Sequence, residues 1–68
     1  MSARIEVHYK GNVYKGNIDI DSTPEQLKDM IYENLSKTEK LALELESGGY
    51  LILGYEAVKT AAILVVET

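Results

Sequence analysis

The chain has 68 residues, no cysteine and a formal net charge of −4 at pH 7. This length fits one domain, residues 1–68, and the absence of thiols excludes disulfides and thiolate metal sites. The negative charge argues against a general binder of nucleic acid or of anionic membranes.

The first predicted element is a β-hairpin. Ile5, Val7 and Tyr9 alternate with polar residues, which is the pattern of a half-buried strand. Gly11-Asn12 is a two-residue turn signal, because glycine adopts positive φ without steric cost. We therefore expect the second strand at residues 13–20.

A turn at this position fixes the register of the predicted hairpin. Ile5 comes to lie opposite Ile18 on an apolar face, and Arg4 opposite Asp19 on a polar face. A shift of one residue would mix the two faces, so the pattern favours this register.

An amphipathic helix is predicted next, at about residues 24–36. Thr23 and Gln26 have the spacing of a capping box, and Pro24 suits the first helical position because its missing N–H is not needed there. The apolar stripe on one face consists of Leu27, Met30, Ile31 and Leu35.

A second hairpin follows a polar connection. Residues 41–46 alternate between apolar and other side chains, whereas residues 50–53 are apolar throughout, so the pattern leaves the register open. A two-residue glycine turn places Leu45 opposite Ile52, and a three-residue turn places it opposite Leu51.

The chain then returns through a short irregular or helical link, residues 55–60, to a final strand at residues 61–66. This strand has no polar alternation. Apolar residues on both faces are typical of a strand inside a sheet. We therefore expect it between the first and third strands, parallel to the first.

The element order resembles the β-grasp, or ubiquitin-like, architecture. IDIDSTPEQLKDMI is similar to the strand-to-helix entry of those domains, and LGYEAVKTAAILVV to their turn into the last, central strand. The resemblance implies an α+β fold of the order ββαβββ, with a mixed sheet, one helix on one face and the C-terminal strand in the centre. The family's Gly-Gly tail has no counterpart, since Gly48-Gly49 is internal, so conjugation and sulfur-carrier chemistry are not carried over.

Residues capable of catalysis are few. His8 is the only imidazole, with Glu6 as its only nearby orienting group, and Glu44 and Glu46 form a carboxylate pair without a third oxygen ligand. We interpret all four as solvated side chains. The prediction is a protein that is not an enzyme and that has no catalytic residue, cofactor or metal.

An uncovered apolar surface is the main functional indication. One helix covers only one face of the sheet, so either Ala61, Ile63 and Val65 or Ala62, Leu64 and Val66 stay exposed on the last strand. The fourth strand adds either Leu51 and Leu53 or Tyr50 and Ile52. Contiguous apolar patches mark partner surfaces. The predicted partner-binding residues are Tyr50, Leu51, Leu53, Tyr55, Ala62, Leu64 and Val66.

The expected partner is another protein or a second copy of the chain, with a dimer favoured, because a domain this small buries only about 60% of its unfolded surface. The alternative is a regulatory or nucleic-acid-binding hairpin. Its basic residues would be Arg4, His8, Lys10 and Lys15, although Glu6 and Asp19 interrupt this cluster. No apolar run approaches the about 18 residues of a membrane span, and no signal peptide is apparent. We therefore expect no membrane partner and a cytoplasmic location.

Overall fold

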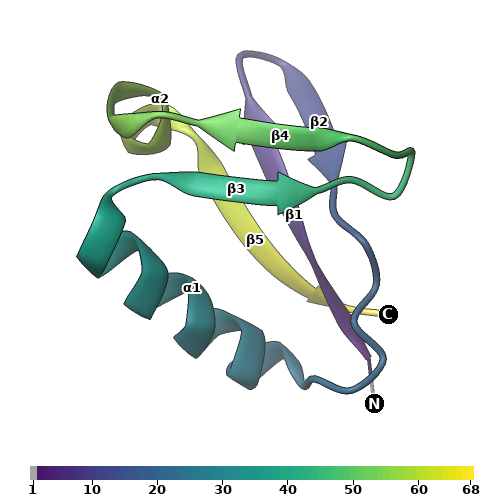
Figure 1. Ribbon diagram of the computed structural model, residues 1–68. Helices are drawn as coiled ribbons and strands as arrows, with labels where there is room; N and C mark the ends of the chain where they lie inside the picture. The colour runs from purple at the N-terminus through teal and green to yellow at the C-terminus, as the bar shows by residue number, and fades with distance from the viewer. Residues whose placement is uncertain (1) are drawn as a thin grey trace.

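The computed structural model describes residues 2–68 and has an α+β fold, as the sequence predicts (Figure 1). The chain folds into strands and helices in the order β1 (Ala3–Tyr9), β2 (Asn12–Lys15), α1 (Pro24–Thr38), β3 (Leu41–Glu44), β4 (Tyr50–Leu53), α2 (Tyr55–Thr60) and β5 (Ala62–Glu67). The strands form a three-stranded sheet, β2-β1-β5, and a two-stranded sheet, β3-β4, and all pairs are antiparallel.

The turn of the first hairpin lies one residue earlier than predicted. Tyr9 pairs with Asn12, so Lys10 and Gly11 are the central residues, with φ of 50° and 81°. A hairpin turn with positive φ at both central positions favours glycine at the second. Gly11 meets that demand in the observed turn, and the predicted Gly11-Asn12 turn is wrong.

A β-bulge interrupts the first hairpin beyond its paired region. The Gly16 N–H donates to the Ile5 carbonyl at 2.8 Å, whereas Ala3 is bridged to Asp19. The chain therefore advances three residues from Gly16 to Asp19 while β1 advances two residues between Ile5 and Ala3. The extra residue reverses which side chains face the core.

The bulge overturns two predicted pairings. Ile18 does not lie opposite Ile5 in the core, and 50% of its surface is exposed, as is 73% of that of Ile20. Asp19 does not pair with Arg4, because it accepts hydrogen bonds from the Asp21 backbone and the Ser22 hydroxyl.

Helix α1 begins with the predicted capping box and runs slightly further than expected, to Thr38. The Thr23 hydroxyl accepts from the Gln26 N–H at 3.2 Å, and the Gln26 side chain accepts from the Thr23 N–H at 2.8 Å. Leu27 and Ile31 are buried as predicted. Met30 is 54% exposed, at the margin of the stripe.

The second hairpin has neither of the two predicted registers. Leu43 pairs with Leu51, and the Leu45 N–H donates to the Gly49 carbonyl, so the connecting loop starts at Glu46. The strands are consequently shorter than the alternating pattern indicates. Leu51 and Leu53 of β4 point toward the core.

The position of β5 corrects the predicted topology. β1 is the middle strand of its sheet, and β5 is an edge strand that runs antiparallel to it, with Ala62 beside His8 and Glu67 beside Ala3. The mixed sheet, the central C-terminal strand and the β-grasp arrangement are therefore wrong. The physical cause is α2, which delivers the chain to the end of β1 and not to its beginning.

The core lies between the three-stranded sheet on one side and α1 with the β3-β4 hairpin on the other. Figure 1 shows the hairpin crossing the sheet, with α1 below it. The buried hydrophobic residues of the core are Ala3, Ile5, Val7, Leu27, Ile31, Leu41, Leu43 and Leu53. Neither helix covers the opposite face of the three-stranded sheet.

Candidate interaction surface

The two faces of β5 have different surroundings. Ile63 and Val65 lie opposite Val7 and Ile5 and pack half-buried against the core. The alternate residues point away from the core, and Leu64 is 37% exposed. Of the two faces that the sequence left open, the outward one is therefore Ala62, Leu64 and Val66.

One edge of β5 is held by β1 and the other is open. The Ile5 carbonyl bonds to the Gly16 N–H, so the odd-numbered residues of β1 bond toward β2. Because antiparallel strands alternate their bonding direction, Glu6 and Leu64 bond to each other across β1 and β5. The N–H and C=O groups of Ile63 and Val65 consequently point to the open edge.

A groove of about 530 Å³ runs between α1 and this open edge. Its β5 wall is made of Ile63 and Val65. The helix wall consists of Pro24, Glu25, Lys28, Ile31, Tyr32 and Leu35. Tyr32 is 68% exposed, so a large ring stands beside an unpaired strand. Helical spacing alone gave no sign of this role, because Tyr32 lies outside the apolar stripe.

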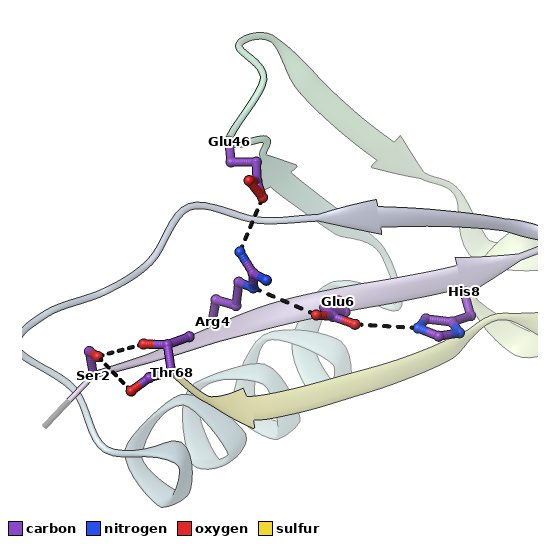
Figure 2. Close-up of polar contacts among 6 residues, drawn as sticks. All are labelled: Ser2, Arg4, Glu6, His8, Glu46 and Thr68. Carbon is purple, nitrogen blue, oxygen red and sulfur yellow. Dashed lines mark hydrogen bonds and ion pairs between the residues drawn. The ribbon is translucent and has the colours of Figure 1, made fainter.

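A polar row occupies β1 beside the outward face of β5 (Figure 2). Arg4 lies 3.1 Å from Glu46 and 3.6 Å from Glu6, and Glu6 lies 3.5 Å from His8, measured between side-chain N and O atoms. Each carboxylate thus has a basic side chain beside it. The sheet face is therefore half apolar, on β5, and half ion-paired, on β1.

The β4 residues of the predicted surface lie elsewhere. Leu53 is 3% exposed and belongs to the core, and Leu51 is half-buried, so neither forms the outward side of β4. The outward residues are Tyr50 and Ile52, which are 71% and 73% exposed. Tyr55 lies in α2, where the centre of its ring is 4.0 Å from the Lys59 ammonium nitrogen.

The predicted continuous patch is therefore divided. β4 belongs to the two-stranded sheet and β5 to the three-stranded sheet. Ile52 points away from the core on the hairpin side, and Leu64 points away on the sheet side. Sequence pattern identified apolar strands correctly but did not show that they lie on different walls of the core.

A second apolar hollow, of about 480 Å³, lies between α1, β3 and the segment after the bulge. The exposed aliphatic side chains at this hollow are Ile18, Ile20 and Met30. Of these, Ile18 was expected on the apolar face of the hairpin and Met30 in the apolar stripe of the helix. Ile18 is exposed because the bulge has no local signal in the alternating pattern.

The basic residues of the first hairpin do not form a continuous surface. Arg4 is half-buried and bonded to Glu46, and Lys15 lies opposite Glu6. The Lys10 ammonium lies 5.3 Å from the centre of the Tyr9 ring, at the turn. This interleaving with acidic groups gives the nucleic-acid alternative no structural support.

Among residues 2–68, no group of three or more His, Asp or Glu side chains is placed to hold a metal ion. None of the helices in this range is long and apolar enough to cross a membrane. The Nε2 atom of His8 lies 3.5 Å from a carboxylate oxygen of Glu6.

No family model matches the chain, and neither a curated protein nor a solved structure is significantly similar to it. A functional assignment therefore rests on the geometry of the chain's own surface. The feature that stands out is β5, with its open edge and the groove beside it.

Proposed function

We propose that this chain is a small non-enzymatic protein-interaction module that self-associates through β5, with a dimer as the favoured assembly. One observation carries the proposal. All residues of β5 except the last, Glu67, are apolar, which is typical of an interior strand, yet β5 lies at the edge of its sheet.

Edge strands of monomeric proteins usually carry features that prevent pairing with another chain. Inward charges, lysines, prolines and bulges are the common ones, because an open edge presents a row of unpaired N–H and C=O groups. β5 contains no lysine and no proline, its only charged residue is Glu67 at the end of the strand, and it pairs with β1 without a bulge. Such an edge is suited to pairing with a strand of another chain and not to exposure to solvent.

The size of the domain supports the same proposal. A chain of 68 residues without a disulfide has a small core, with eight buried hydrophobic residues among residues 2–68. Each apolar side chain that passes from water into an interface contributes about 25 cal/mol per Å² of buried surface. The largest gain in buried apolar surface is expected at Ile63, Leu64 and Val65, because each side chain is only partly covered in the single chain. We place the protein in the cytoplasm as part of this proposal.

Light scattering coupled to gel filtration tests the proposal at micromolar concentrations. We expect the unmodified chain to elute as a dimer and Leu64→Lys to elute as a monomer. Ile52→Lys is the matched control, because Ile52 is more exposed but lies on β4. It should remain dimeric. Chemical denaturation checks that both variants fold. An unmodified chain that stays monomeric throughout this range would contradict the proposal.

A further inference from the structure

We infer that the open edge of β5 pairs with β5 of a second copy, antiparallel about a two-fold axis at Leu64. The two three-stranded sheets then join into one sheet of the order β2-β1-β5-β5-β1-β2. This inference rests on the proposed self-association and specifies its geometry. It differs from a dimer in which the outward faces of two sheets stack.

The backbone provides the first reason. Ile63 and Val65 direct their N–H and C=O groups to the open edge, as the ladder with β1 requires. Within residues 62–66, each strand therefore offers two donors and two acceptors to an incoming strand. A second copy of β5 offers the same set, so an antiparallel pair satisfies both copies equally. Such a contact closes on itself and stops at two copies.

The side chains favour the register centred on Leu64. Ile63 then lies opposite the partner's Val65, and Leu64 opposite the partner's Leu64. Glu67 faces the partner's Ala61, at the end of the paired segment. A register centred on Val65 would instead place Glu67 opposite the partner's Ile63, beside the groove. The Leu64 register pairs residues 62–66 of one copy with residues 62–66 of the other, so Glu67 lies outside the paired apolar stretch.

The groove between α1 and β5 provides the second reason. An added strand would lie with its core-side residues over Ile31, Tyr32 and Leu35, which make the helix wall. These apolar groups would cover the partner's Ile63 and Val65. The polar residues of the wall, Glu25 and Lys28, have opposite charges, so they set up no like-charge barrier.

The polar row on β1 argues against the stacked arrangement. Stacking the outward faces would bury Arg4, Glu6 and His8 together with Leu64. The ion pairs among these residues are partly hydrated, with Arg4 and Glu6 side chains 19% and 17% exposed and His8 44% exposed. Removing such groups from water costs more than their mutual attraction returns unless the geometry is ideal. Edge pairing leaves this row in contact with water.

Amide hydrogen exchange followed by NMR at low and high protein concentration tests the inference. We expect the Ile63 and Val65 amides to exchange at least about tenfold more slowly when the dimer dominates, because they bond only in the dimer. The Leu64 amide, which bonds to β1, should be protected at both concentrations. A dimer in which the Ile63 and Val65 amides exchange fast would overturn the edge pairing and leave the proposed self-association intact.

A backbone variant provides the second measurement. Chemical synthesis of the chain with N-methyl-Val65 removes one outward N–H and keeps every side chain. We expect this variant to fold and to be monomeric, with N-methyl-Ile52 as the control, because Ile52 has its N–H on the open edge of β4. An N-methyl-Val65 chain that dimerises like the control would contradict the inference. A strictly monomeric unmodified chain would overturn both proposals and leave the edge to a strand of an unrelated protein.

Discussion

Gly16 lies where the two hairpins meet. Its N–H bonds to Ile5 of β1, and a bridge joins it to Leu45 beyond β3. A Cβ atom at this position would lie 2.8 Å from the Leu43 Cδ1 and 3.0 Å from the Ile5 carbonyl oxygen. Glycine is required here by this close approach of backbone and core side chain.

Replacing Gly16 with alanine should destabilise the protein. The added methyl group must displace Leu43 from a packed core, which costs about 1–3 kcal/mol. Urea denaturation followed by circular dichroism measures the change. Gly54→Ser is the control, because a Cβ at Gly54 meets nothing within 4 Å and serine suits its helix-capping position. A Gly16→Ala chain as stable as the control would show that Leu43 adjusts freely.

The elements differ in how far the sequence determines them. Helix α1 was predicted closely, since a capping box and a 3.6-residue stripe are local signals that act within one segment. The strand registers were not predicted correctly, because they depend on which residue takes positive φ at a turn. Lys10 takes it in the first hairpin, and a bulge after Gly16 then reverses the faces.

The Lys10-Gly11 turn leads to a gain-of-stability prediction. Asparagine tolerates positive φ better than lysine, so Lys10→Asn should raise the free energy of unfolding by about 0.5–1 kcal/mol. Lys10→Val should lower it, because a β-branched side chain is strained at a φ of 50°. Thermal unfolding of the two variants and the parent checks the order. An Asn variant less stable than the parent would contradict the observed turn.

At the scale of the whole molecule, the candidate site was only partly visible in the sequence. Ala62, Leu64 and Val66 were predicted as one alternative for the open face, and they do point away from the core. The predicted surface includes Leu53, which lies in the core, because an apolar run does not determine the hairpin register. The open edge and its groove depend on where β5 enters the sheet, which no local pattern encodes.

The mismatch between the composition of β5 and its position has one simple resolution. The composition of β5 is typical of a strand inside a sheet, and β5 takes that position when a second chain adds to the sheet. Its open edge would then have a neighbouring strand, and Leu64 would lie beside the partner's Leu64 on the outward face of the joined sheet. The single chain shows half of that arrangement.

An isotope-filtered NOE experiment on a mixture of labelled and unlabelled chains tests this claim most directly. Leu64 pairs with the partner's Leu64 in the proposed register without a hydrogen bond, and such pairs bring the two Cα atoms to about 4.5 Å. We predict an intermolecular contact between the Leu64 Hα protons at concentrations where the dimer dominates. A dimer that shows intermolecular contacts only at other surfaces, or a sample that shows none, would contradict the account.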